Sequence, residues 1–307
     1  ESLCMINGKE ELLHDIRVAN FIEAYRFSCI SKRDKWYSFS NIEWDPILSE
    51  IKIEAIINFI DSSYTINQII RQDTIPKKSI GNQRFKYTIL EPLKESKIFF
   101  KESDITGTIL IQNYFPYYDI IHHSSVSQNN VENMFNFYSD RCKAKVSVEL
   151  HKKNNTTHKY FDCVGFREHS WGLYPSHHIS CDSRVVVHFR DQTISFRYIE
   201  YNGMSYSYGC ISKKSGNLAL VLVELEFLSI KNSSFESSEF TYKDAQDDID
   251  LIVSKPIKPH HIEVSKKLKK SHLHIISFSD FTVIGTNKKG YGIEEHLISH
   301  ERLKNVL

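Results

Sequence analysis

GFREHSWG, at residues 165–172, is the most informative stretch of this sequence. An acid, a base, a hydroxyl and a tryptophan lie between two glycines, directly after a strand-like run at residues 159–164. On an extended backbone, successive side chains point to opposite faces. Arg167, His169 and Trp171 therefore share one face, while Glu168 and Ser170 share the other.

The sequence on either side of this stretch alternates with a period of two. Ile51, Ile53, Ala55 and Ile57 are separated mostly by polar residues, as is typical of a half-buried strand. Aromatic and β-branched residues dominate further segments of this kind, at residues 85–89, 144–150, 194–198 and 204–208. Turn signals occur at residues 202–203, 214–216 and 288–290. This pattern predicts an all-β protein built as a sandwich or barrel.

Helical signals are few, and the composition changes along the chain. Residues 10–24 and 131–138 fit short helices, and no regular alternation of strand and helix is present. Eight of the eleven glycines lie at or beyond Gly165. A chain of 307 residues is long enough for two domains. We therefore predict two all-β domains, at residues 1–174 and 175–307.

The charge balance limits the classes of partner. Lys and Arg total 39 and Asp and Glu total 38, a net charge of +1, which argues against a nucleic-acid-binding protein. A cytoplasmic location is expected. A basic run is a candidate contact with an anionic membrane surface, the alternative being a solvated loop. That run is Lys266, Lys267, Leu268, Lys269 and Lys270.

Common cofactor, metal and nucleophile motifs are missing. The six cysteines form no CxxC pair, and we expect them to be reduced and mostly buried on strands. His272 and His274 would share a strand face, and His296 and His300 would meet on a helix, but no third metal ligand can be named. The sequence also lacks a GxSxG elbow, a P-loop and a GxGxxG fingerprint. We predict no metal and no cofactor.

The GFREHSWG stretch resembles the Asp-His-Ser-Trp-Gly signature of the tandem-lipocalin family that contains hydroxyneurosporene synthase, the carotenoid 1,2-hydratase. GYGIE, at residues 290–294, is similar to that family's closing Gly-x-Gly-x-x-Glu strand. Fungal lipocalin-like Diels–Alderases resemble this family in architecture. The resemblance covers residues 159–295 and implies two lipocalin-like barrels in tandem. Glu168 stands where the family usually has Asp, and Leu173 with Tyr174 replaces a Pro-Arg pair.

The resemblance implies a hydrophobic pocket for a polyene, terpenoid or polyketide-like ligand, within or between the barrels. Hydration of an isolated alkene needs an acid that protonates carbon and a water that captures the cation. Glu168 is the predicted proton donor, kept uncharged by burial near an aromatic wall, with His169 orienting it and Glu294 as the alternative acid. The predicted substrate-binding residues are Arg167, Trp171, Phe196, Tyr198, Tyr25 and Trp44.

Several functions remain open on these residues. A cyclase would use the same acid but let a second alkene capture the cation. A pericyclase would need no acid, because it would lower the barrier by holding the substrate folded. A non-catalytic carrier of lipids or isoprenoids would use the same barrels without chemistry. In a purely structural interpretation, Trp171 is a core residue at the domain interface and Arg167 forms an ordinary ion pair with Glu168.

Overall fold

The structure is a computed structural model, and it describes residues 20–45, 48–59, 62–71, 78–119, 135–152, 155–174, 179–231, 234–246, 248–264 and 272–304. Within these residues the chain forms nineteen strands and one short helix, α3 (His300–Lys304). No helix in this part of the chain is long and apolar enough to cross a membrane. The predicted all-β fold class is confirmed, whereas the basic run at residues 266–270 lies outside the described residues.

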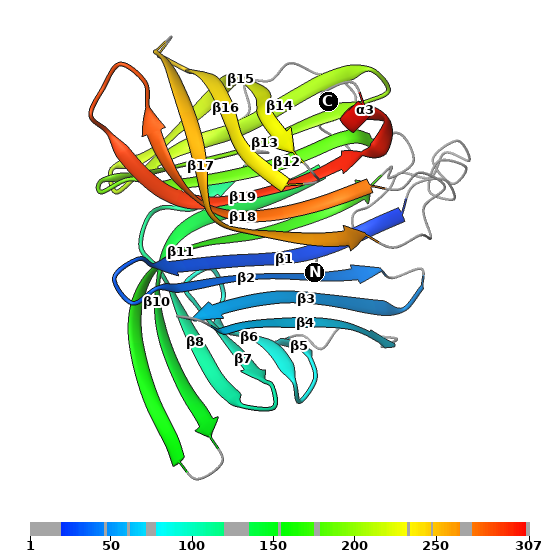
Figure 1. The fold of residues 1–307 in the computed structure, drawn as a ribbon, viewed down its shortest axis with the longest axis vertical. Coiled ribbons are helices and arrows are strands. Elements are labelled where there is room, and N and C mark those ends of the chain that lie inside the picture. Colours follow the sequence, from blue (N-terminus) through cyan, green and yellow to red (C-terminus); the bar gives the residue numbers. More distant parts are fainter. Residues whose placement is uncertain are drawn as a thin grey trace.

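The first eleven strands form one antiparallel sheet, ordered β4-β3-β2-β1-β11-β10-β8-β7-β6-β5, with β9 paired to β10. The sheet curls around its own core (Figure 1). The strands are β1 (Asn20–Ser31), β2 (Trp36–Asp45), β3 (Glu50–Phe59), β4 (Ser62–Arg71), β5 (Ser79–Gly81), β6 (Phe85–Glu91), β7 (Glu95–Lys101), β8 (Ile105–Asn113), β9 (Tyr118–Asp119), β10 (Phe135–Lys152) and β11 (Asn155–Tyr174).

The remaining eight strands close into a barrel, in sequential order from β12 to β19, with β19 paired back to β12. The chain passes from the first sheet to this barrel between Tyr174 and Ile179. The strands are β12 (Ile179–His188), β13 (Gln192–Tyr201), β14 (Met204–Lys213), β15 (Gly216–Lys231), β16 (Ser234–Asp244), β17 (Ile249–Val264), β18 (His272–Val283) and β19 (Lys289–Ser299).

Each sheet encloses its own apolar core, and a third cluster joins the two. Figure 1 shows the sheets one above the other, with β1 next to the C-terminal barrel. We call the cluster between them the apolar seam. It consists of Ile30, Tyr37, Phe39, Ile56 and Phe166 from the first sheet and Val186, Ile276, Phe278 and Ile293 from the barrel.

The helix predicted for residues 10–24 is wrong in its described part, residues 20–24, because β1 pairs with β11 from Asn20 onward and with β2 from Glu23 onward. Phe27 and Cys29 face the core of the first sheet, while Ile30 faces the apolar seam. A strand buried on both faces loses the alternation that identifies strands in a sequence. The second predicted helix is also wrong in its described part, because residues 135–138 belong to β10. Residues 10–19 and 131–134 lie outside the described part.

Two of the three predicted turns and the burial of the cysteines on strands agree with the predictions. The turns at residues 202–203 and 214–215 connect β13 to β14 and β14 to β15. Lys289 and Gly290, in contrast, already belong to β19, so the connection after β18 comes earlier than predicted. The five described cysteines are buried on strands and form no disulfide: Cys29, Cys142, Cys163, Cys181 and Cys210.

Gly292 permits the closure of the barrel, because β12 passes directly against its backbone. A Cβ at this position would overlap the Val186 carbonyl oxygen and lie 2.8 Å from the Val186 carbonyl carbon. We expect Gly292→Ala to lower the free energy of unfolding by about 1–3 kcal/mol, measured by urea denaturation, because backbone must move. Gly203→Asn is the control. Gly203 lies in an open turn at φ 76°, which asparagine tolerates, so a loss equal to that of Gly292→Ala would contradict this explanation.

Candidate functional site

The GFREHSWG stretch lies on β11, between β1 and β10 in the first sheet. Its two faces carry different chemistry. Arg167, His169 and Trp171 point into the first sheet's interior, while Glu168 and Ser170 both contact Arg26 on the side that meets the barrel. The predicted division of these residues between two faces is confirmed.

The inner face forms a compact group around His169. The His169 ring stacks on Tyr25 at a centroid distance of 4.2 Å and lies 5.0 Å from the Trp171 ring. Its Nε2 atom is 2.8 Å from Glu23 Oε1, which also accepts a hydrogen bond from the Tyr25 hydroxyl at 2.7 Å. Burial raises the pKa of Glu23, but these hydrogen bonds more than offset it, so the pKa lies below its ordinary value.

Arg167 pairs with Asp140 rather than with Glu168. Its Nε and Nη2 atoms donate to Asp140 Oδ2 on the neighbouring strand β10, and Nη2 also donates to the Leu93 carbonyl. The ordinary ion pair between Arg167 and Glu168 that a structural interpretation suggested is therefore wrong. The reason is the pleat of the strand, which sends adjacent side chains to opposite faces.

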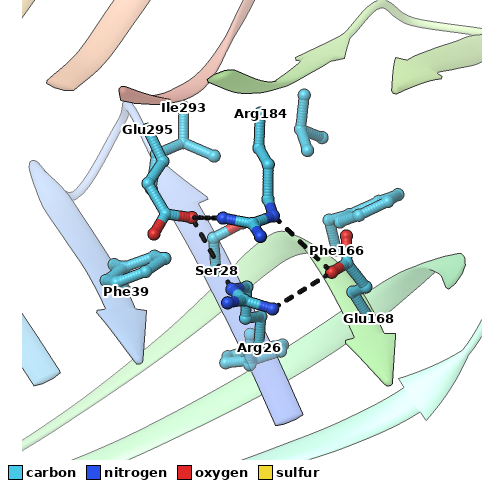
Figure 2. A pocket seen from close by; sticks show the side chains of 10 residues that line it. Arg26, Ser28, Phe39, Phe166, Glu168, Arg184, Ile293 and Glu295 are labelled. Atoms are coloured by element: carbon cyan, nitrogen blue, oxygen red, sulfur yellow. Dashed lines mark hydrogen bonds and ion pairs between the residues drawn. The ribbon is translucent and has the colours of Figure 1, made fainter. Parts of the chain in front are cut away.

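The outer face contributes to four alternating charges that we call the charge ring: Arg26, Glu168, Arg184 and Glu295. Going round the ring, the closest nitrogen-to-oxygen distances are 3.3, 3.9, 3.4 and 3.7 Å. Figure 2 shows the two guanidinium groups between the two carboxylates. Arg26 and Glu168 come from β1 and β11, whereas Arg184 and Glu295 come from β12 and β19. The charge ring therefore joins the two domains.

A small cavity lies against the charge ring. Its volume is about 30 Å³, roughly the space of one water molecule. All four ring side chains line it, and Phe39, Phe166, Val186 and Ile293 of the apolar seam supply its apolar walls (Figure 2). The ring side chains are only 8–14% exposed, so the charges lie in a nearly dry setting where their electrostatic effects are strong.

In each arginine of the charge ring, the Nε atom faces a ring carboxylate at more than hydrogen-bonding distance: Arg26 Nε lies 3.7 Å from Glu295, and Arg184 Nε lies 3.9 Å from Glu168. The Nε atoms of Arg26 and Arg184 are buried and make no hydrogen bond to any described residue. A buried N–H group without a partner is costly, which favours an oxygen-bearing ligand or water beside it. The ring can therefore receive an acceptor oxygen at two guanidinium groups while two carboxylates stand beside them.

The electrostatics hold Glu295 ionised. Burial raises the pKa of Glu295, but the charges of Arg184 and Arg26 and a hydrogen bond with His274 bring it well below its ordinary value. Arg184 is in turn shared with Asp182, at 3.2 Å, which also binds Arg197. A network of buried charges therefore fixes the position of the ring.

Glu168 is paired rather than isolated. The sequence predicts an uncharged acid beside an aromatic wall, but the structure places Arg26 and Arg184 against this carboxylate. The tertiary fold brings these two arginines, which are distant in sequence, to the site, so Glu168 is not an isolated acid. A role of Glu168 in catalysis stays a prediction.

Among the other predicted site residues, Tyr25 lies with His169, on which it stacks. Trp44 packs against the core of the first sheet, and Phe196 lies inside the barrel with Phe240. Tyr198 hydrogen-bonds to Glu200 and Ser205 on the barrel wall.

Glu294 lies apart from the cavity lining. It is fully buried within the barrel, where it accepts a hydrogen bond from Ser238 at 2.6 Å and lies near His296. Its neighbour Glu295 lines the cavity instead. Counted from Gly290, the Gly-x-Gly-x-x-Glu spacing ends on Glu295, and this signal could have identified the residue. Arg26 and Arg184 carry no comparable signal in the sequence.

The histidines that suggested metal binding have other partners. His272 contacts the Ile179 carbonyl, and His274 contacts Glu295. His296 lies on strand β19, so it does not meet His300 on a helix as predicted. In the described part of the chain, no group of three or more His, Cys, Asp or Glu residues could hold a metal ion.

His274 links the two domains because it contacts one carboxylate from each of them. Its ring lies 3.1 Å from Glu295 and 3.6 Å from Glu54 on β3. Burial lowers the pKa of His274, but the hydrogen bond with Glu295 and both carboxylate charges raise it above the ordinary value. A raised pKa stabilises the fold below about pH 6.5, and this stability is lost as the pH rises through the folded-state pKa.

We therefore expect the free energy of unfolding to fall between about pH 6.5 and the higher pKa of folded His274, in urea denaturation at successive pH values. His274→Gln should flatten this part of the pH profile. His158→Gln is the control, because His158 is 54% exposed beside Glu149. An unchanged slope in His274→Gln would show that another group titrates.

Solved structures share this architecture at very low sequence identity. CghA, solved with Sch210972, matches with a TM-score of 0.66 and 9% identity, covering 91% of this chain and 89% of that chain. A Nitrosomonas europaea protein assigned to AttH matches at 0.67 and 9%, covering 96% of both chains. Kievitone hydratase from Nectria haematococca matches at 0.60 and 9%, covering 91% and 89%.

The similarity between this chain and these solved structures concerns the fold. The sequence matches no protein-family model and no curated protein. Because the structural matches extend over nearly the whole chain, both domains and their order are shared with these proteins. The chain therefore has a tandem, lipocalin-like two-barrel fold.

Proposed function

We propose that this protein is a cofactor-independent hydratase or cyclase that acts on a hydrophobic, unsaturated small molecule at the charge ring. The observation that carries the proposal is a pair of buried guanidinium N–H groups that make no hydrogen bond to a described residue, at Arg26 Nε and Arg184 Nε, 3.7 and 3.9 Å from the ring carboxylates and beside an apolar wall. The hydratase among the proteins of similar fold and the resemblance of residues 165–172 to the carotenoid 1,2-hydratase family support it. Hydration and cyclisation leave the oxidation state unchanged, so neither requires a redox cofactor.

The charge ring suits an alkene conjugated to a carbonyl group better than an isolated alkene. A ring carboxylate takes a proton from water while the water oxygen bonds to the electron-poor carbon. The guanidinium N–H groups stabilise the negative charge that develops on the carbonyl oxygen. The carboxyl group then returns its proton to the neighbouring carbon. In a cyclisation, a nucleophilic group of the substrate replaces the water.

The cavity admits only the reacting group. A volume of about 30 Å³ holds one water or one carbonyl oxygen, whereas the substrate's body is far larger. The apolar walls next to the ring are side chains, Phe39 and Phe166 among them, and these must move apart for the body to enter. A substrate that fills this site excludes water from it, which strengthens the electrostatic effect of the ring.

The test is incubation of the purified protein with conjugated polyenes and enones, followed by mass spectrometry. Hydration adds the mass of one water, and a product of unchanged mass but altered retention indicates cyclisation. Binding without any product would identify a carrier and overturn the proposal. A reaction in H₂¹⁸O should place the heavy oxygen in the hydrated product.

Glu168→Gln tests the proton-transfer role directly. The amide keeps the size of the side chain but cannot exchange the proton, so we expect kcat to fall by roughly 10²-fold or more with little change in substrate affinity. Glu224→Gln, on the exposed side of β15, is the matched control. A larger loss in Glu294→Gln than in Glu168→Gln would instead move the chemistry into the barrel interior.

A further inference from the structure

A second, larger hollow lies along the same boundary between the domains. Its volume is about 540 Å³, in the range of small-molecule sites. We call it the basic hollow, and its defining side chains are Lys32, Lys255, Lys289, Asp280, Ile284 and Tyr291. Lys32 follows β1, and the others come from β17, β18, β19 and the β18–β19 turn.

The basic hollow and the charge ring share one face of β19. Lys289 and Tyr291 line the hollow, while Ile293 and Glu295 line the cavity at the ring. These alternate residues point to the same side of the strand. Tyr291 also packs against the apolar seam. A ligand held in the hollow therefore lies at one end of the seam, with the charge ring further along it.

Positive charges outnumber negative charges in the lining of the basic hollow. Three lysines face one acid, and that acid is engaged, because Lys32 Nζ lies 2.5 Å from Asp280 Oδ1. Lys255 and Lys289 are exposed and form no ion pair within the described residues. The hollow consequently offers two uncompensated ammonium groups to a ligand.

The lining of the basic hollow is also apolar. Ile284 is 50% exposed, Val253 and Tyr291 are half-buried, and Phe281 forms part of the wall. The Lys32 ammonium lies over the Tyr291 ring, 5.9 Å from its centroid. An apolar body fits this lining, and an anionic group fits the lysines at its edge. Inorganic phosphate alone would leave the apolar wall unused.

We propose that the basic hollow binds a soluble organic acid, with its apolar body against Tyr291 and Ile284 and its carboxylate between Lys255 and Lys289. The further statement that this acid is the substrate of the charge ring rests on the proposed function. In that arrangement the hollow selects acidic substrates and holds one end while the unsaturated end reaches along the seam to the ring.

Two fluorescent probes that differ in one charged group test the binding. 1-Anilinonaphthalene-8-sulfonate carries a sulfonate, whereas N-phenyl-1-naphthylamine has the same rings without it. We expect the anionic probe to bind the full chain at least tenfold more tightly, because each ammonium group attracts it. Dodecanoate should displace it, and dodecanol should not.

The double variant Lys255→Gln/Lys289→Gln locates the site. It should raise the Kd of the anionic probe about tenfold and leave that of the neutral probe unchanged. Lys213→Gln/Lys214→Gln, exposed at the β14–β15 turn, is the control. Equal affinity for both probes, or an equal loss in both double variants, would overturn the proposal. Displacement of the probe by phosphatidylglycerol vesicles but not by dodecanoate would also overturn it.

Failure of this proposal is separable from failure of the proposed function. Glu168→Gln should bind the anionic probe as the unaltered protein does, whether or not the protein turns over any substrate. If the protein does turn over a set of conjugated alkenes, acids should have a lower KM than their methyl esters. The Lys255→Gln/Lys289→Gln variant should remove that difference in KM, and persistence of the difference would contradict the selection of acids.

Discussion

Asp182→Ala should destabilise the protein by about 3–5 kcal/mol in urea denaturation at pH 7, because it removes the buried acid that two buried arginines share. The Asp182 side chain is fully buried, and it accepts hydrogen bonds from Arg197 at 2.8 and 2.7 Å and from Arg184 at 3.2 Å. Burial raises the pKa of Asp182, but the two guanidinium groups depress it well below its ordinary value. Two cations would therefore remain in a dry setting without this partner.

The pH dependence gives an independent check of the same assignment. A depressed pKa stabilises the fold above the unfolded-state value of about 3.9, and this stability is lost as the pH falls through the folded-state pKa. The difference between the unaltered protein and Asp182→Ala should therefore shrink below about pH 4. Glu91→Ala is the control, because Glu91 and Lys94 form an exposed pair that is worth about 1 kcal/mol or less. Equal losses in the two variants would contradict the importance of the buried network.

The sequence is sufficient for the fold class because several segments alternate between apolar and polar residues, and strands such as β6, β7 and β8 are buried mainly on one face. The alternation at residues 51–57 identifies β3, and the same reasoning divides the side chains of residues 165–172 between two faces. Strand β1 escapes this reasoning because apolar residues stand on both of its faces, Phe27 and Cys29 on one and Ile30 on the other. Its pairing with β11 across more than a hundred residues brings Arg26 to Glu168, and no local pattern encodes such a contact.

The sequence predicted a site residue from the first sheet, Glu168, but neither of the two charge-ring residues from the barrel. Glu168 is prominent in the sequence because it stands in an unusual string, whereas Arg184 sits in an ordinary strand. Closure of the barrel places Arg184 opposite Glu295 in the β12–β19 register. Both residues then face the first sheet, and their charges change the chemistry expected of Glu168. The sequence around an acid does not reveal the charged partners that the tertiary fold brings to it.

The largest effect on turnover is expected from Arg184→Gln. The substitution removes one of the two guanidinium groups from the charge ring, and we expect kcat to fall by roughly 10²–10³-fold, as when a charge-stabilising donor is lost from an active site. Arg184 is also the strongest influence that lowers the pKa of Glu295. Its loss should raise that pKa, so the acidic limb of the pH–rate profile should move to higher pH.

Arg26→Gln separates this catalytic role from a loss of stability. Arg26 belongs to the charge ring but does not contact Asp182, so the buried network around Asp182 stays intact in this variant. We expect the same direction of change in kcat and in the acidic limb, with less destabilisation than in Arg184→Gln. Arg33→Gln, at an exposed arginine in the β1–β2 turn, should change neither. If both ring variants keep full activity while folded, the charge ring is only a structural link between the domains, because an electrostatic role requires its guanidinium groups to contact the reacting oxygen.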